Sequence, residues 1–140
     1  MMEERIVKGL ENAPEARLIR QAVFVDEQGF KNEFDDIDST AYQGILTENG
    51  SPVAVGRLFT ENGEYHIGRI AVMKPYRGKG LGREVVELLE SKISELGGGT
   101  AVLSAQVRVK GFYETMGYTA FGEEYLDEYC PHISMKKLIK

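Results

Sequence analysis

One stretch of the chain decides the fold: RIAVMKPYRGKGLG, residues 69–82, in which an apolar run leads into a basic loop with three alternating glycines. After the loop, apolar residues recur every three or four positions from Leu81 to Leu96, which predicts a long helix. Glycines let backbone N–H groups face a ligand without obstruction by Cβ, and a helix N-terminus favours anions. A strand, this loop and a helix in that order therefore predict a phosphate or pyrophosphate site.

Two familiar phosphate loops are excluded by single residues. A P-loop needs Ser or Thr after its Gly-Lys pair, but Gly80 follows Lys79. A dinucleotide fingerprint needs a third glycine at position 85, which is Val85. The expected ligand is therefore neither a nucleoside triphosphate held by Lys79 nor a dinucleotide. The structural alternative is a solvated glycine-rich turn.

The segments on either side of this loop alternate between strand and helix patterns. Strands are predicted at residues 5–10, 42–48, 53–60, 64–72, 101–106, 118–122 and 133–138, and helices at 12–29, 81–96 and 110–116. Two connectors contain Asn-Gly, at 49–50 and 62–63, which favours an antiparallel meander between residues 42 and 72. The order predicts an α/β (α+β) fold, with one mixed sheet and helices on both of its faces.

Length and composition limit the function classes. The 140 residues predict a single domain over residues 1–140, and 42% hydrophobic with 28% charged residues is typical of a globular protein. The formal charge of −5 argues against a nucleic-acid or membrane partner. Cys130, His66 and His132 do not have metal-ligand spacing, so no metal is expected. The acidic N-terminus does not resemble a signal peptide, and no apolar run reaches about 18 residues, so we expect a cytoplasmic protein.

The loop also resembles the signature of a known family. Residues Arg77 to Gly82 resemble the Arg/Gln-x-x-Gly-x-Gly/Ala motif of the GNAT superfamily of acetyl-CoA-dependent N-acetyltransferases. Gln106 and the string FYETMGY at 112–118 resemble the family's Asn followed seven residues later by Tyr, with Gln in place of the usual Asn. VFVDEQ at 23–28 and HISM at 132–135 resemble the small bacterial ElaA/YjcF-like group, although Ala41-Tyr42 stands where a His is often found.

The resemblance implies a fold and a cofactor. It implies a GNAT-like single domain: a mixed, mostly antiparallel twisted sheet of six or seven strands, with helices on both faces and strands four and five splayed. Acetyl-CoA would be the cosubstrate. The residues implied to bind it are Ile70, Ala71, Val72, Arg77, Gly78, Lys79, Gly80, Leu81, Gly82, Gln106 and Tyr113. Backbone N–H groups of the loop would hold the pyrophosphate, supported by Arg77, and residues 70–72 would hold the pantetheine arm as an added strand.

The resemblance further implies acetyl transfer to a primary amine of a small acceptor, by direct attack through a tetrahedral intermediate. Tyr113 would protonate the leaving thiolate, since a tyrosine with a pKa near ~10 is protonated at neutral pH. Glu27 and His132 are the candidate bases that accept the proton of the amine. The structural alternatives are a packed aromatic for Tyr113, a helix or loop cap for Glu27 and a hydrogen-bonded side chain for His132.

Other interpretations stay open at this point. Asp35, Asp36 and Asp38 predict a solvated acidic loop, or a segment that attracts a cationic acceptor. The same fold could serve as a non-catalytic acyl-CoA-binding sensor or interaction module. A nucleic-acid-binding or structural domain is a more distant alternative, because the chain has no wider Arg/Lys stripe. A monomer and a homodimer are both compatible with the sequence.

Overall fold

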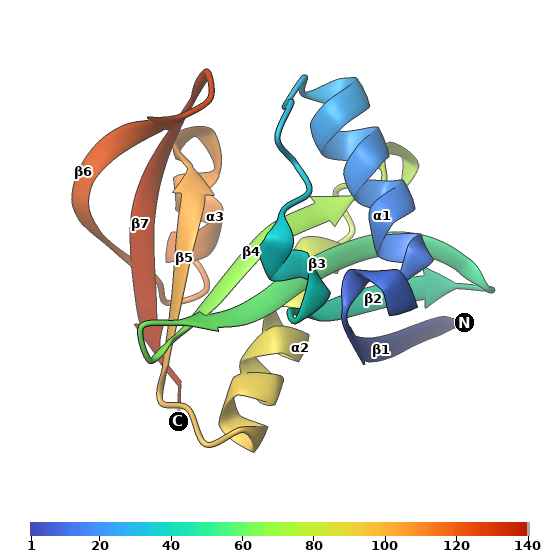
Figure 1. Ribbon diagram of the computed structural model, residues 1–140, viewed down its shortest axis with the longest axis horizontal. Helices are drawn as coiled ribbons and strands as arrows, with labels where there is room; N and C mark the ends of the chain where they lie inside the picture. Colours follow the sequence, from blue (N-terminus) through green and yellow to red (C-terminus); the bar gives the residue numbers. More distant parts are fainter. Residues whose placement is uncertain (140) are drawn as a thin grey trace.

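A seven-stranded sheet forms the centre of the computed structural model, which describes residues 1–139 (Figure 1). The strand order is β1-β2-β3-β4-β5-β7-β6. The strands are β1 (Met2–Lys8), β2 (Tyr42–Glu48), β3 (Ser51–Glu61), β4 (Glu64–Val72), β5 (Thr100–Gln106), β6 (Thr119–Asp127) and β7 (Cys130–Leu138). All neighbouring pairs are antiparallel except β4 and β5. This confirms the predicted mixed, mostly antiparallel sheet.

Helices cover both faces of the sheet, as predicted. The elements are α1 (Pro14–Arg20), which continues into the π-helical segment η2 (Gln21–Glu27), then α2 (Leu81–Glu95) and α3 (Lys110–Glu114), with short 3₁₀ segments η1 (Leu10–Asn12), η3 (Asp36–Ser39), η4 (Lys74–Tyr76) and η5 (Val107–Val109). Figure 1 shows α1 and α2 on opposite faces. Each face has its own cluster of buried apolar side chains, one with α1 and one with α2 and α3.

Alternation along the central strands supplies both clusters. In β3, Val55 packs in the cluster of α1, whereas Ala54 and Leu58 pack in the cluster of α2. Gly56 lies under α2, where a Cβ would stand only 2.7 Å from Cγ1 of Val85. The absence of a side chain at Gly56 therefore lets α2 approach the sheet closely, directly after the glycine loop that begins the helix.

The strands that separate are β4 and β5. They pair in parallel only between Tyr65–Ile67 and Ala101–Leu103, and their later residues have no mutual pairing. The pairing of β3 with β4 shifts between Val55 and Arg57, which marks a bulge in β4 near Arg69. This divergence confirms that strands four and five splay, and Figure 1 shows them running apart toward the end of β4.

Several predicted boundaries differ from the structure. The first strand covers residues 2–8 rather than 5–10, because pairing with β2 defines it and its mostly exposed side chains leave little apolar pattern. The strand predicted at 118–122 runs to Asp127, although almost all of β6 is exposed. The helix predicted over 12–29 is α1 followed by the π-helical η2. No helix within residues 1–139 combines the length and the apolar character needed to cross a membrane.

Candidate active site

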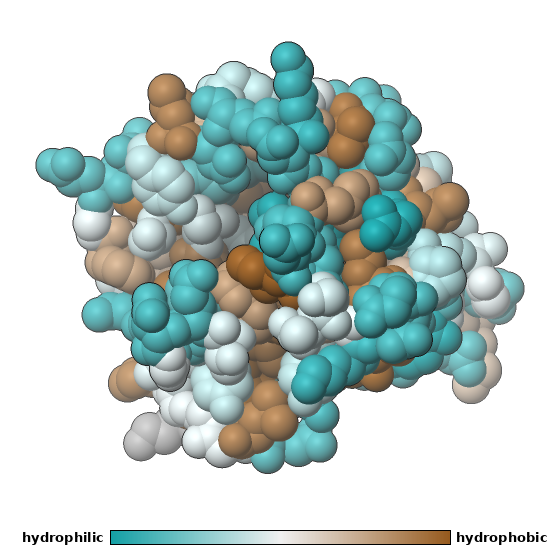
Figure 2. Space-filling view, in the orientation of Figure 1, coloured by the Kyte–Doolittle hydropathy of each residue, from teal (hydrophilic) through white to brown (hydrophobic). Residues whose placement is uncertain are grey.

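A cavity of about 340 Å³ occupies the region where β4 and β5 separate. Its walls come from β4, β5, α3, β7 and the segment that follows η2. Its lining includes Gln106, Tyr113 and His132 together with Ile70, Val72 and Gly82, so residues predicted for both cofactor and catalysis meet in one space. Figure 2 shows a hollow on this face, with hydrophobic residues at its bottom and hydrophilic ones around it.

The glycine loop lies between the end of β4 and α2. Gly78 and Gly80 have positive φ values of 80° and 79°, a conformation that side chains with a Cβ rarely adopt. Gly80 is the residue before α2, and the first helical hydrogen bond runs from Glu84 N to Gly80 O. Within residues 1–139, the N–H groups of Gly78, Lys79 and Gly80 have no hydrogen-bond partner. The loop therefore presents several unpaired donors next to a helix N-terminus.

Arg77 and Glu27 contact each other. Arg77 Nη1 donates to Glu27 Oε2 at 2.6 Å, and Nη2 donates to Oε1 at 2.7 Å. Arg77 Nε also donates to the Val72 carbonyl oxygen at 2.9 Å. The hydrogen bonds from Arg77 hold the pKa of the Glu27 carboxyl below its usual range. Two residues predicted for separate roles, pyrophosphate support and proton acceptance, thus form one ion pair that links η2 to the loop and to β4.

Tyr113 lies in α3 and is 8% exposed. Its ring packs edge-on against Phe112 and Tyr118, with centroid separations of 4.9 and 5.9 Å. The hydroxyl has no hydrogen-bond partner within residues 1–139, and burial raises the pKa of Tyr113 to about 12. The residue is therefore both a packed aromatic and part of the cavity wall.

His132 is a buried residue of β7, opposite Gln106 in the strand register. Its Nδ1 lies 2.9 Å from the carbonyl oxygen of Cys130. A carbonyl oxygen only accepts, so Nδ1 is assigned as the donor, and in the neutral ring Nε2 keeps its lone pair. The ring stacks on Tyr125 and lines the cavity. In this tautomer Nε2 is the ring nitrogen that can accept a hydrogen bond.

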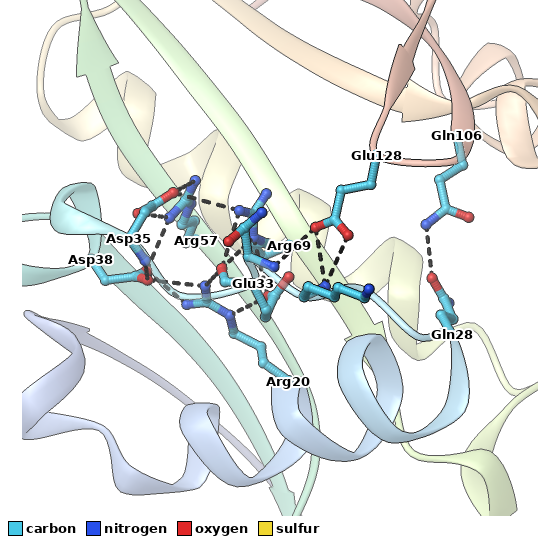
Figure 3. A network of polar contacts seen from close by, with 11 residues as sticks. Arg20, Gln28, Glu33, Asp35, Asp38, Arg57, Arg69, Gln106 and Glu128 are labelled. Carbon is cyan, nitrogen blue, oxygen red and sulfur yellow. Dashed lines mark hydrogen bonds and ion pairs between the residues drawn. The ribbon is translucent and has the colours of Figure 1, made fainter.

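Three contacts join the two sides of the cavity, and we call them the cross-cavity contacts (Figure 3 shows the first two). Gln106 Nε2 donates to Gln28 Oε1 at 2.9 Å. The Glu128 carboxylate accepts from the backbone N–H groups of Lys31 and Asn32, each with a shortest distance of 2.9 Å. The Tyr129 hydroxyl donates to the Gln28 carbonyl oxygen. Hydrogen bonds of Glu128 and Tyr129 thereby link the turn between β6 and β7 to the segment after η2.

A cluster of six charged residues lies beside the cavity, between α1 and the sheet, and comprises Arg20, Arg57, Arg69, Glu33, Asp35 and Asp38 (Figure 3). Arg20 is fully buried, and its Nη1 donates to Asp38 Oδ1 at 2.7 Å. Arg20 Nε donates to Glu33 Oε2 at 2.8 Å. Burial acts against ionisation of Asp38, but its bonds to Arg20 and its contact with Arg57 outweigh burial and lower its pKa to about 2.

The predicted solvated acidic loop is wrong for Asp38, which is buried, whereas Asp35 and Asp36 are exposed. Asp38 is 3% exposed, the neighbouring Glu33 is 5% exposed, and Asp35, although exposed, pairs with Arg57 at 2.8 Å. The reason is that three arginines face this segment, and none of them is near it in the sequence. In the predicted strand at 53–60, side chains alternate between the two faces, so Arg57 shares a face with the buried Val55. This alternation was the feature of the sequence that indicated a buried arginine at position 57.

Cys130 and the two histidines do not form a metal centre. No group of three or more His, Cys, Asp or Glu side chains in the described part of the chain is placed to hold a metal ion. Cys130 is a buried free thiol near the carbonyl oxygen of Pro131, and His66 stacks on Phe59 with a centroid separation of 5.1 Å.

Comparison with known proteins agrees with this architecture. The family model for the acetyltransferase (GNAT) domain matches residues 12–139. The uncharacterized N-acetyltransferase YjcF of Bacillus subtilis is 31% identical over 139 residues, which cover 97% of this chain and 99% of that protein. An acyl-CoA N-acyltransferase from Pseudomonas aeruginosa superposes with a TM-score of 0.87 at 25% identity, covering 98% of this chain and 99% of the other. Escherichia coli ElaA gives a TM-score of 0.86 at 25% identity, with the same coverage. The chain therefore belongs to the GNAT family of acetyl-CoA-dependent N-acetyltransferases, in the group that includes YjcF and ElaA.

Proposed function

We propose that this chain transfers the acetyl group of acetyl-CoA to a primary amine of a small acceptor, by direct attack through a tetrahedral intermediate. The observation that carries the proposal is the separation of β4 from β5 after three paired positions, next to a loop with unpaired N–H groups. An extended ligand can occupy the free edge of β4 while its phosphates lie at the N-terminus of α2.

The backbone supplies most of the proposed cofactor contacts. The N–H groups of residues 78–82 take the pyrophosphate, and the free edge of Ile70, Ala71 and Val72 takes the pantetheine arm. Arg77 acts through the loop rather than on the phosphates, since its guanidinium is bound to Glu27 and to the Val72 carbonyl. Lys79 is exposed and adds a positive charge near the phosphates. Gln106 presents its amide from the end of β5.

Tyr113 is the proposed donor to the leaving sulfur. Its raised pKa keeps the hydroxyl protonated at any working pH. Complete transfer of this proton to a thiolate whose conjugate acid has a pKa near ~8.5 is uphill, so the main contribution is a hydrogen bond that stabilises the developing thiolate. A hydroxyl without a protein partner is available for that bond.

His132 is the proposed base, in preference to Glu27. Deprotonating a lysine-like amine with a pKa near ~10.4 at pH 7 costs about 4–5 kcal/mol, so the amine needs an acceptor for its proton. His132 has a free Nε2 lone pair in the cavity wall. Both oxygens of Glu27 are bound by Arg77, and the lowered pKa makes Glu27 a weaker base. We therefore assign Glu27 to positioning the loop.

A thiol-release assay tests the proposal. Acetyl-CoA is incubated with the protein and a panel of primary amines, and free CoA is measured against time. We expect release with a subset of the amines and a matching N-acetylated product by mass spectrometry. Acetyl-CoA binding by calorimetry without release for any amine would contradict acetyl transfer and support the non-catalytic acyl-CoA-binding module.

A further inference from the structure

The backbone of Arg69 is unusual for its residue type. Arg69 has a φ of 54°, although it is not a glycine, and it lies in the β4 bulge. Ile67 packs on the side of α2 and Ala71 on the side of α1, so the bulge inverts the alternation of the strand. Regular alternation from Ile67 would direct Arg69 toward α2. The bulge instead turns its guanidinium toward Glu33 and Asp35, at the cavity.

The guanidinium of Arg69 keeps unused donors. Its Nε and Nη2 donate to the carbonyl oxygen of Glu33 at 3.2 and 3.1 Å. Its Nη1 makes no hydrogen bond to any residue between 1 and 139, and the side chain is 24% exposed while lining the cavity. Arg57 lines the same cavity, and its buried Nε also has no partner. The cationic side of the cluster therefore has spare hydrogen-bond donors.

The neighbours hold Arg69 in place. Glu33 Oε2 lies 3.1 Å from Arg69 Nε and is itself bound by the fully buried Arg20. Asp35 Oδ2 lies 3.5 Å from Arg69 Nη2. A guanidinium fixed in this way loses little side-chain freedom on binding, and its Nη1 keeps two N–H groups that can donate to a carboxylate oxygen.

We infer that Arg69 binds a carboxylate of the acceptor, so that the acceptor is a small amino acid or another amine that carries a carboxylate. The inference rests on the proposed acetyl transfer. Arg69 directly precedes Ile70, the first residue of the proposed pantetheine edge, so a carboxylate held there keeps the amine of a small molecule beside the thioester. The nearby Glu33 and Asp35 disfavour a dianionic phosphate, and the unused N–H donors disfavour a purely cationic acceptor.

Matched acceptors test this inference. The thiol-release rate is measured for each of the twenty common L-amino acids and for its carboxamide, which keeps the shape and removes the negative charge. We expect kcat/KM to favour the best acid over its carboxamide by about tenfold to a hundredfold, mainly through KM. Arg69→Gln should reduce this ratio to about one, while activity toward the carboxamide changes little. Arg108→Gln, which removes another cavity arginine, should keep the preference.

A second readout does not require turnover. Thermal unfolding of the protein saturated with CoA is measured with N-acetyl-amino acids and with their carboxamides. We expect stabilisation by the acids that is lost in Arg69→Gln. Such stabilisation without any thiol release would support the carboxylate site and contradict acetyl transfer. Equal use of acids and carboxamides, equal stabilisation by both, or an unchanged preference in Arg69→Gln would overturn the inference and leave acetyl transfer intact.

Discussion

At the scale of single residues, the proposed chemistry depends on the hydroxyl of Tyr113. Tyr113→Phe removes the proposed donor to the leaving sulfur but keeps the edge-on packing with Phe112 and Tyr118. We expect kcat to fall by about tenfold to a hundredfold, with the Kd for acetyl-CoA nearly unchanged. Steady-state kinetics and calorimetry measure the two quantities. An unaltered kcat would remove Tyr113 from the mechanism.

His132 gives a prediction that depends on pH. His132→Gln keeps a polar side chain in β7 but removes the basic nitrogen. We expect kcat to fall by about a hundredfold at pH 7 and to recover partly as the pH approaches the pKa of the amine, because more of the acceptor is then already neutral. The pH profile of kcat in both proteins measures this. A variant with the same reduction at every pH would contradict a role as base.

Asp38 makes the stability of the charged cluster depend on acidic pH. Its pKa of about 2 in the folded protein lies below the ordinary value of 3.8, so the folded state binds fewer protons between these values. Asp38 therefore contributes about 2 kcal/mol to the free energy of unfolding above pH 4, and this contribution is lost as the pH falls toward 2. Titration of its carboxyl carbon by NMR should give a midpoint near 2. A midpoint close to 4 would contradict the buried ion pair.

Residue patterns predicted part of the site and missed another part. Gln106, Tyr113 and His132, for which the family resemblance implied roles in binding or catalysis, all line one cavity, and their roles stay predictions. The ion pair between Glu27 and Arg77 joins positions 50 residues apart, so no local pattern could indicate it. The partners of Asp38 are similarly remote, at Arg20 and Arg57. The sequence shows where the acidic residues are, but it does not show which arginine side chains contact them in the folded protein.

At the scale of elements, the glycine loop can be tested with a matched pair of variants. Gly80 and Gly50 both have positive φ, at 79° and 84°, and a Cβ on either one meets no atom within 4 Å. Gly80→Val and Gly50→Val therefore introduce similar backbone strain. We expect only Gly80→Val to weaken acetyl-CoA binding, by several kcal/mol, because its side chain blocks the backbone approach of the pyrophosphate. Equal affinity of both variants by calorimetry would refute the pyrophosphate site.

The cross-cavity contacts give a second prediction for an element, the turn between β6 and β7. Glu128→Ala removes the acceptor for the N–H groups of Lys31 and Asn32. We expect faster hydrogen exchange at these two amides and a higher KM for the acceptor, since the segment forms part of the cavity wall. Glu124→Ala, an exposed position in β6, is the control. Unchanged hydrogen exchange at these two amides in Glu128→Ala would contradict the role of Glu128 in linking the turn to residues 31 and 32.

The periodicity of apolar residues predicted which segments form strands and helices better than it predicted the residues at which they begin and end. The strands at 42–48 and 64–72 have the predicted bounds, because an apolar pattern and the Asn-Gly turns define both limits. The strands β1 and β6 lie at the edges of the sheet and are largely exposed, so hydrogen bonding to their neighbours sets their length. The bulge at Arg69 was not predicted, because it is visible only in the tertiary packing, where Ile67 and Ala71 lie on opposite faces.

At the scale of the whole molecule, the separation of β4 and β5 leaves the two parts of the sheet joined by few strand contacts. A ligand bound along the free edge of β4 would add contacts that only the folded state makes. We expect acetyl-CoA at a hundred times its Kd to stabilise the protein by about 2.7 kcal/mol and to raise Tm by roughly 5–10 °C. Thermal unfolding with increasing acetyl-CoA measures this. A constant Tm at saturation would argue against binding to the folded chain.

An NMR titration of ¹⁵N-labelled protein with acetyl-CoA locates the proposed cofactor site residue by residue. We expect the largest changes in backbone amide signals on residues 78–83 and 70–72, at the N-terminus of α2 and the free edge of β4. Binding of acetyl-CoA that leaves these amides unmoved, with the changes clustered on another face of the sheet, would contradict this site.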